Sequence, residues 1–507
     1  MAEQTIFVGA GDKPAQLLAR YGNRDGLIAG ATGTGKTVTL KVLVEGFSRL
    51  GVPVFVADMK GDMAGLAMPG EASDRLNTRL QKLKITDWAP SANPVVFWDL
   101  FQQNGHPLRA TISEVGPLLL ARMLELNDVQ SGVLDIVFAA ADAEGLMLLD
   151  LDDLRSMLNF VVEHKDEIGK KFGLVSPQTV AAIQRQLLSL ARDGAEKFFG
   201  EPALDLNDFM RQDFSGRGAI NILSAETLLL KPRLYSTALL WLLSELFENL
   251  PEVGDQPLPK LVFFFDEAHL LFADAPKALT DRIEQVVRLI RSKGVGVFFC
   301  TQSPADLPDT VLAQLNNRVQ HALRAATPRE QKAVKVAAET FVPNPKLDVA
   351  SVIGQLEIGE ALVSMLDDKG SPAPVERALI APPKSRFGAI TPEERNTVRM
   401  RSPVGGKYDT TINRESAHEL LAKRAQATAA PPAAPQTQPA GGNTGWWDSG
   451  SQQQPPPDQP RGRAPAAPRV SNRQSVGEAF MKSAVRSVGS TVGRQLIRGL
   501  LGSLSRR

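Results

Sequence analysis

Short apolar runs alternate with longer stretches of helical periodicity over residues 1–385. The runs that are bounded by glycine or polar clusters, as is typical of strands buried on both faces, lie at 26–29, 52–57, 219–223, 261–265 and 295–300. Helical spacing predicts helices at 37–50, closed by Gly51, and at 280–293, closed by Gly294. This alternation of strand and helix predicts an α/β fold with a mainly parallel sheet.

The stretch 64–255 is too long for a single crossover between two strands, and it holds several amphipathic patterns. One predicted helix opens at Ser176 and Pro177, a capping residue followed by a first-turn proline, and runs towards Gly194. We therefore expect a large, mostly helical insertion at 64–255, carried on the sheet of a domain formed by residues 1–385.

The composition changes after this domain. A C-terminal extension is expected at 386–426, and proline, alanine, glutamine and glycine then dominate 427–470, as in a disordered linker. Within the linker, the pair Trp446–Trp447 is either a short docking motif or a bystander. Residues 471–507 regain helical spacing with an apolar stripe and basic residues, which predicts a basic amphipathic helix. This helix could pack on the protein or its own copies, lie on a membrane surface, or bind nucleic acid.

Charge and cysteine content narrow the possibilities. The net charge of +1 neither indicates nor excludes binding of nucleic acid, because a binding groove needs only a few local cations. The single cysteine, Cys300, excludes an internal disulfide and a cysteine-rich metal site, and its apolar neighbours predict a buried strand position. The N-terminal residues lack a secretory signal, and no window reaches about 18 uninterrupted apolar residues. We therefore expect a cytoplasmic protein.

The strongest motif is GATGTGKT at 30–37, which follows a predicted strand and opens a predicted helix. Glycines let backbone N–H groups curl around phosphate oxygens, and the helix N-terminus presents further N–H groups to the same anion. Lys36 should reach the β and γ phosphates, and the Thr37 hydroxyl should ligate Mg²⁺. The motif predicts binding of Mg-ATP. The residues expected to contact the nucleotide are Gly30, Ala31, Thr32, Gly33, Thr34, Gly35, Lys36, Thr37 and Val38.

A second motif is the apolar strand LVFFF at 261–265, which ends in the adjacent carboxylates Asp266 and Glu267. Downstream of a P-loop, this pattern indicates a Walker B element. Asp266 should hold Mg²⁺ through its water shell, and Glu267 should orient or deprotonate the attacking water. His269 follows in the same turn, where turn packing explains it as well as catalysis does. The two motifs together predict hydrolysis of ATP.

Three further polar positions each have two interpretations. Gln302, at the tip of the strand beside LVFFF, either touches the γ-phosphate or the attacking water, or caps the strand. Arg291 either acts as an arginine finger across a subunit boundary, or lies on a solvated face where Glu284 pairs with Arg288. Asp58, after the run 52–57, either orients the P-loop or the waters of Mg²⁺, or caps a loop.

The order of the motifs GATGTGKT, VFVADMKGD, LVFFFDEAH, RLIRSKGVGVFFCTQSP and LNNRVQHALRA resembles the HerA/FtsK branch of P-loop ATPases. More narrowly, residues 6–383 and the C-terminal GRQLIRGLLG are similar to the bacterial HerA-like proteins of the YjgR family. This resemblance implies a RecA/FtsK-like P-loop NTPase fold and hexameric rings that pull double-stranded DNA through a central pore, with ATP at each subunit interface. It also implies that Arg291 is the trans-acting finger, that Gln302 senses the γ-phosphate and that 359–362 forms a closing hairpin.

The chain also departs from this family. Archaeal HerA carries an N-terminal β-barrel that binds its nuclease partner, whereas only 29 residues precede Gly30 here, so the resemblance does not carry that partnership over to this chain.

Two functions therefore follow from the motifs. The first is a ring-forming, ATP-driven double-stranded DNA translocase or helicase-like motor. The second is an ATP-dependent switch or assembly factor that docks on a protein partner or a membrane surface through 471–507. The letters DEAH at 266–269 do not indicate a tandem-domain helicase, because too few folded residues follow Gln302 for a second motor domain. A small-molecule kinase is disfavoured because the chain lacks a lid-like arginine cluster.

Overall fold

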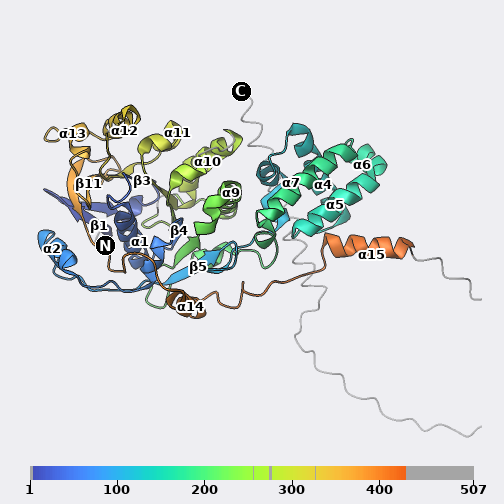
Figure 1. Ribbon diagram of the computed structural model, residues 1–507, viewed down its shortest axis with the longest axis horizontal. Coiled ribbons are helices and arrows are strands. Elements are labelled where there is room, and N and C mark those ends of the chain that lie inside the picture. The colour runs from blue at the N-terminus through green and yellow to red at the C-terminus, as the bar shows by residue number, and fades with distance from the viewer. Residues whose placement is uncertain (1–3, 255, 273–276, 326, 430–507) are drawn as a thin grey trace, which may run out of the picture. The chain divides into compact units, whose positions relative to one another are not determined.

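The computed structural model describes residues 4–254, 256–272, 277–325 and 327–429, which contain a twelve-stranded sheet and the helices around it (Figure 1). The strand order is β2-β1-β12-β11-β10-β3-β9-β8-β4-β7-β5-β6. The strands are β1 (Thr5–Ala10), β2 (Pro14–Leu18), β3 (Gly26–Ala29), β4 (Val54–Asp58), β5 (Val95–Asp99), β6 (His106–Pro107), β7 (Ile220–Ser224), β8 (Leu261–Phe265), β9 (Val295–Thr301), β10 (Asn317–Gln320), β11 (Glu360–Ser364) and β12 (Glu376–Ile380).

The helices of the described residues differ widely in length. The α-helices are α1 (Lys36–Arg49), α2 (Asp74–Lys82), α3 (Ile112–Met123), α4 (Asp128–Glu144), α5 (Leu151–Glu163), α6 (Lys165–Phe172), α7 (Pro177–Arg192), α8 (Leu206–Phe209), α9 (Pro232–Asn249), α10 (Lys277–Ile290), α11 (Asp309–Leu312), α12 (Pro328–Glu339), α13 (Val349–Ile353), α14 (Pro392–Met400) and α15 (Ala417–Ala429). The 3₁₀ helices are η1 (Ala19–Tyr21), η2 (Asp62–Ala67), η3 (Ala195–Lys197), η4 (Glu226–Leu230), η5 (Ala268–Leu271), η6 (Arg291–Lys293) and η7 (Pro304–Asp306).

The predicted α/β fold with a mainly parallel sheet is confirmed. From β10 through β3, β9, β8, β4, β7 and β5 to β6, neighbouring strands run parallel. On the other side of β10, the strands β11, β12, β1 and β2 pair antiparallel. All five predicted strands are present, as β3, β4, β7, β8 and β9, with ends within two residues of the expected positions.

Both faces of the central strands are buried, because alternate side chains enter two different hydrophobic clusters. In β8, Val262 and Phe264 join the cluster that contains residues of α1, whereas Phe263 and Phe265 join the cluster that contains residues of α9 and α10. Cys300 lies in the first of these clusters and is buried, as predicted. A layer of helices on each face explains why these strands are continuous apolar runs.

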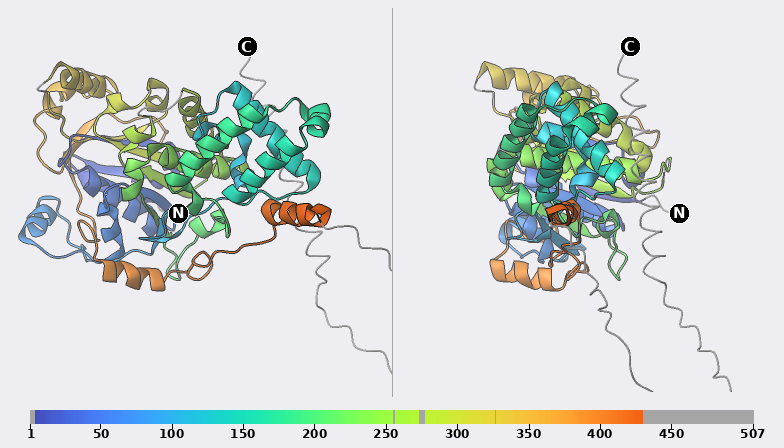
Figure 2. Two further views of the ribbon diagram at one scale, coloured as in Figure 1. Left: turned by 45° about the vertical axis from the view of Figure 1, so that its right-hand side comes forward. Right: turned by 90° about the vertical axis from the view of Figure 1, so that its right-hand side faces the viewer.

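The helical part of the chain is narrower than the predicted range 64–255. Strands β5 and β7 lie inside this range and pair with each other and with β4, so only α3 to α8, at 112–209, remain as a helical insertion. In both views of Figure 2, the helices α4 to α7 form one packed group. Ser176 precedes Pro177 at the start of α7, but its hydroxyl donates to Gln178 and does not cap the backbone. The short run at β5 was missed because it has no glycine or helix pattern to mark its ends.

The C-terminal extension is not a separate unit, because residues up to Thr428 belong to one compact unit. The amides of Lys384 and Ser385 each donate to the carboxylate of Glu45 in α1, both at 2.8 Å. In the same helix, the buried Lys41 donates from Nζ to the carbonyl of Arg386 at 2.7 Å. The segment after β12 therefore holds the helix that follows the predicted P-loop.

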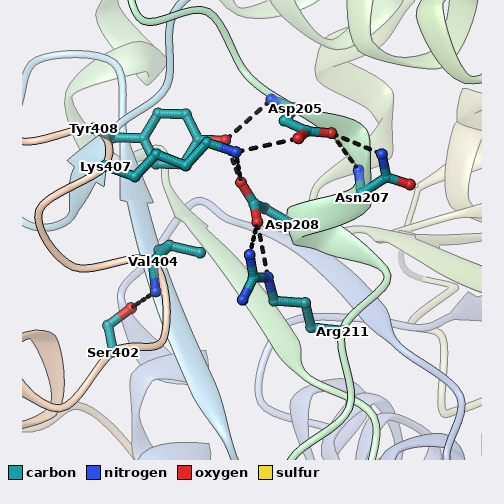
Figure 3. A network of polar contacts seen from close by, with 8 residues as sticks. All are labelled: Asp205, Asn207, Asp208, Arg211, Ser402, Val404, Lys407 and Tyr408. Carbon is teal, nitrogen blue, oxygen red and sulfur yellow. Dashed lines mark hydrogen bonds and ion pairs between the residues drawn. The ribbon is translucent and has the colours of Figure 1, made fainter. Parts of the chain in front are cut away.

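Further along, the extension is tied to α8 by a polar network around Asp208 (Figure 3). Its buried carboxylate accepts hydrogen bonds from Lys407 at 2.6 Å, from the Tyr408 hydroxyl and from Arg211. The Tyr408 ring packs edge-on against Trp98 of β5, with ring centroids 5.1 Å apart. Burial acts to raise the pKa of Asp208, but the hydrogen bonds from Lys407, Tyr408 and Arg211 outweigh it and lower that pKa.

Several predictions for the C-terminal part lie outside the described residues: most of the linker at 427–470, with Trp446–Trp447, and the helix at 471–507. Helix α15 runs to Ala429, so the first three residues assigned to the linker are helical. Within the described part of the chain, the helices are too short or too polar for any of them to span a bilayer.

We expect the substitution Asp208→Asn to destabilise the protein by about 1–3 kcal/mol, because it weakens charge-assisted hydrogen bonds at a buried site. The folded-state pKa of Asp208 is lowered, so this contribution should be complete above pH ~4 and should be lost as the pH falls further. Denaturant unfolding at pH 7 measures the change, with Asp166→Asn at an exposed position of α6 as the control. Equal midpoints for the two variants would contradict the proposed role of the network.

Candidate functional site

The carboxyl ends of four neighbouring parallel strands gather the predicted site residues at one edge of the sheet. Ala29 at the end of β3 pairs with Thr301 of β9, and Phe299 of β9 pairs with Phe265 at the end of β8. Phe265 in turn pairs with Ala57 of β4. The loops that follow β3, β8, β9 and β4 therefore lie side by side, at the edge where ligands collect in open α/β sheets.

The loop after β3 has the backbone that the GATGTGKT motif predicts. Gly30, Gly33 and Gly35 have φ angles of 151°, 81° and 117°, which side chains rarely allow. A Cβ on Gly30 would lie 2.5 Å from the Cβ of His321, whereas at Gly33 it would meet nothing within 4 Å. The loop is thus packed tightly against the protein on one side and open on the other.

A histidine of the neighbouring strand supports this loop from behind. The buried His321, directly after β10, lies with Nδ1 2.9 Å from the carbonyl of Glu360 and with Nε2 2.8 Å from Oγ1 of Thr39. A carbonyl only accepts, so Nδ1 carries the proton and Nε2 accepts from the threonine hydroxyl. Burial, together with the charge of Lys36, lowers the pKa of His321 to about 4, so the ring is neutral at pH 7.

Lys36 begins α1 and folds back over the loop. Its Nζ donates to the carbonyls of Gly30 at 2.7 Å and of Ala31 at 3.2 Å. The N-cap residue, Gly35, offers no side-chain acceptor to the amides of the first turn. Free amides and an ammonium group at one place indicate a site for an anion. A chain of phosphates fits such a site, because the loop is open at Gly33.

The two carboxylates of the predicted Walker B element are buried. Asp266 and Glu267 follow β8 directly, and Glu267 has a left-handed backbone with φ 50° and ψ 47°. One oxygen of Glu267 forms an ion pair with Lys60, and the other accepts a hydrogen bond from Gln302 at 3.4 Å. Nδ1 of His269 lies 3.4 Å from this second oxygen.

The two carboxylates differ in their electrostatic surroundings. Burial and the charge of Glu267 raise the pKa of Asp266, against the opposing charge of Lys60. Burial would also raise the pKa of Glu267, but the hydrogen bond and charge of Lys60, together with the charges of His269 and Lys36, lower it. Glu267 is therefore the carboxylate that stays ionised most readily, as a proton acceptor must.

The residues present fit a magnesium ion that is bound mainly through phosphate and water. Thr37 lies in the first turn of α1, and Asp266 is a buried carboxylate whose charge is only partly offset. In the described ranges, His, Cys, Asp and Glu side chains do not come together in threes as a metal site of their own would require. Mg²⁺ in nucleotide sites is held in this way, by one or two protein ligands with phosphate oxygens and waters.

Asp58, at the end of β4, caps its own loop. Its carboxylate accepts from the amides of Gly61 at 2.8 Å, Met63 at 3.0 Å and Lys60 at 3.3 Å. Burial and the nearby charge of Asp266 raise its pKa to about 7, against these three hydrogen bonds. Of the two interpretations of Asp58, these contacts favour the loop cap.

The structure separates Arg291 from the other predicted residues. Arg291 lies in η6, before β9, and its charge acts on Asp25, which precedes β3. Both positions are at the amino ends of parallel strands, roughly 20 Å from the carboxyl edge at about 3.3 Å per residue. Arg291 therefore does not reach the candidate site of its own chain.

Sequence reasoning missed the roles of two residues at this edge. Lys60 forms the ion pair with Glu267, and His321 supports the P-loop from β10. Lys60 lies two residues after β4, the strand that pairs with β8. His321 directly follows β10, the strand that pairs with β3. The strand order was the missing information, because neither residue has a local spacing that marks it.

We expect His321 to make the protein sensitive to acid. The pKa of about 4 in the folded state lies below the usual value near 6.5, so the unfolded chain takes up the proton first as the pH falls. As the pH falls from 6.5 to 4, the free energy of unfolding should decrease by up to about 3 kcal/mol because of His321. The variant His321→Gln should not show this decrease. Unfolding free energies of both proteins at pH 7 and pH 4 measure the difference. Asp58, whose pKa is about 7, also titrates in this range, but it is present in both proteins and its effect cancels. Parallel pH dependences would contradict this account.

Comparison with known proteins gives a family and a fold. A family profile described as the helicase HerA-like C-terminal family matches residues 3–507. A probable helicase of Methanocaldococcus jannaschii is 33% identical over 120 residues, which are 23% of this chain and 21% of that protein. The match thus spans about a fifth of that relative's length.

Among solved structures, the bacterial conjugative coupling protein TrwB matches with a TM-score of 0.50 and 14% identity, over 77% of this chain and 92% of that chain. TrwB in complex with a non-hydrolysable ATP analogue gives the same TM-score and coverage at 15% identity. These likenesses show the fold alone. Because the family profile covers nearly the whole sequence, we conclude that this chain belongs to the HerA-like helicase C-terminal family, with a P-loop NTPase fold of the HerA/FtsK type.

Proposed function

We propose that this protein binds Mg-ATP through residues 30–38 and hydrolyses it with Glu267 as the base, as a ring-forming motor on double-stranded DNA. One observation carries the proposal: an open, glycine-bent loop and Lys36 lie at the same sheet edge as two buried carboxylates. Family membership supports nucleotide hydrolysis coupled to movement, and TrwB, which shares the fold, has been solved with an ATP analogue.

The residues would divide the chemistry as follows. The loop amides and Lys36 bind the phosphates, and Thr37 and Asp266 hold Mg²⁺, which when bound neutralises charge on the phosphate oxygens. Glu267 takes the proton from the attacking water, and Gln302, which already contacts Glu267, helps to place that water. The separation of Arg291 from its own site supports a role at the site of a neighbouring subunit.

We propose a hexameric ring with ATP at each interface, and double-stranded DNA as the substrate that is moved. The alternative is a switch or assembly factor that docks through 471–507, a segment outside the described residues. The ATP site suits both functions, and the match to a helicase-like family favours the motor. An ATPase assay over a range of protein concentrations, with and without linear duplex DNA, tests the motor. Turnover per subunit should rise with both, and a rate that responds to neither would contradict it.

We expect Lys36→Ala to weaken the binding of Mg-ATP by about 2 kcal/mol or more, because it removes the ammonium from the phosphate site. In contrast, Glu267→Gln should leave nucleotide binding intact and lower kcat by about 10²–10⁴-fold, because an amide cannot accept the proton. Calorimetry and steady-state kinetics separate the two effects. Loss of binding in Glu267→Gln, or retained turnover, would remove Glu267 from the role of base.

Arg291→Ala should lower kcat by about 10³-fold with little change in nucleotide affinity, as for a finger acting in trans. The exposed Arg288 of α10 supplies the matched control, Arg288→Ala. Mixing Arg291→Ala with Lys36→Ala subunits should restore part of the activity, because some interfaces then combine an intact P-loop with an intact finger. If mixing restores nothing, Arg291 does not act across an interface.

A further inference from the structure

The ion pair between Lys60 and Glu267 joins a fixed group to a movable one. The Glu267 side chain is 6% exposed and lies at the end of a buried strand, whereas the Lys60 side chain is 45% exposed. Burial alone would lower the pKa of Lys60, but the hydrogen bond and charge of Glu267 raise it, so the ammonium is charged. The ammonium can leave its partner for solvent, but Glu267 cannot.

The backbone below Lys60 is held in place. Asp58 accepts hydrogen bonds from the amides of Lys60, Gly61 and Met63, so this loop is a rigid base for a long side chain. A lysine on such a base can change its partner through its own rotatable bonds, with no movement of the sheet.

A second partner for Lys60 is at hand in the proposed ATP site. The Lys60 ammonium lies on Glu267 in an ion pair, and the Lys36 ammonium lies on the carbonyls of Gly30 and Ala31 at the same edge of the sheet. Lys36 belongs to the phosphate-binding loop, and the water that Glu267 activates must lie next to the terminal phosphate. That phosphate would therefore lie next to Glu267, the carboxylate that the Lys60 ammonium contacts. A phosphate group also offers more negative charge and more acceptor oxygens than a carboxylate.

We propose that Lys60 is a positioning residue that distinguishes nucleoside triphosphate from diphosphate. It holds Glu267 until a γ-phosphate arrives, then moves to that phosphate and leaves the carboxylate free to accept a proton. A diphosphate has no group at this position, so Lys60 stays on Glu267 when ADP is bound. This inference rests on the proposed function of the site, and it adds a triphosphate contact that sequence motifs do not predict.

The test uses the full chain with the substitution Glu267→Gln. This variant cannot form the ion pair with Lys60, and it should not hydrolyse ATP during the measurement. In this background we compare Lys60 with Lys60→Met and Lys60→Gln, and measure Kd for Mg-ATP and for Mg-ADP by calorimetry. Loss of Lys60 should weaken ATP binding about tenfold, as for one charge-assisted contact, and change ADP binding less than twofold. Lys60→Arg should recover most of the ATP affinity, and Lys13→Met, at an exposed turn, is the control.

Unchanged ATP affinity in Glu267→Gln/Lys60→Met would overturn the inference, because Lys60 would then serve Glu267 alone. Equal losses for ATP and ADP would overturn it too, since they would indicate a general effect on the loop. Both results leave the proposed function standing as long as Lys36→Ala weakens ATP binding in the same assay. If ATP binds no better with Lys36 than without it, the proposed function itself fails, and this inference fails with it.

Discussion

Burial of two adjacent carboxylates is the constraint on which the site depends. Asp266 and Glu267 follow a strand that is buried on both faces, and two like charges at such a place are stable only with positive partners nearby. Lys60 supplies one partner, Lys36 acts from the phosphate loop, and a magnesium ion would supply another. A site that needs positive charge on one side and offers amides and ammonium groups to an anion on the other suits a metal-bound triphosphate.

The sheet brings these groups together, and contacts distant in sequence hold it in register. Phe264 of β8 stacks on Phe298 of β9, with ring centroids 4.9 Å apart. This contact aligns the strand that ends before Asp266 with the strand that ends before Gln302. On the side of β3 away from β9, His321 joins Thr39 of α1 to Glu360 at the start of β11 and lies directly behind Gly30, so the antiparallel part of the sheet supports the loop and its helix. The segment at 384–386 is bonded to α1 through Glu45 and Lys41. Strain introduced in the C-terminal extension would thus be felt at the helix that follows the P-loop.

Much of the fold and the centre of the site could be predicted from sequence, because local patterns carry them. Continuous apolar runs marked β3 and β8, and glycine spacing marked the phosphate loop. What local patterns did not carry is adjacency in the sheet. Lys60 belongs to a motif that the sequence shows, but the sequence does not show that its partner is Glu267. Strands β4 and β8 are about two hundred residues apart and become neighbours only through the strand order. The width of the helical insertion was overestimated for the same reason, because β5 is short and its pairing with β7 is long-range.

The most direct measurement is a structure of the full chain with a non-hydrolysable ATP analogue and Mg²⁺. The account predicts the triphosphate inside the loop at 30–37, with the metal between Thr37 and Asp266 and the terminal phosphate facing Glu267. A nucleotide bound elsewhere, or a loop that stays empty at saturating analogue, would contradict it.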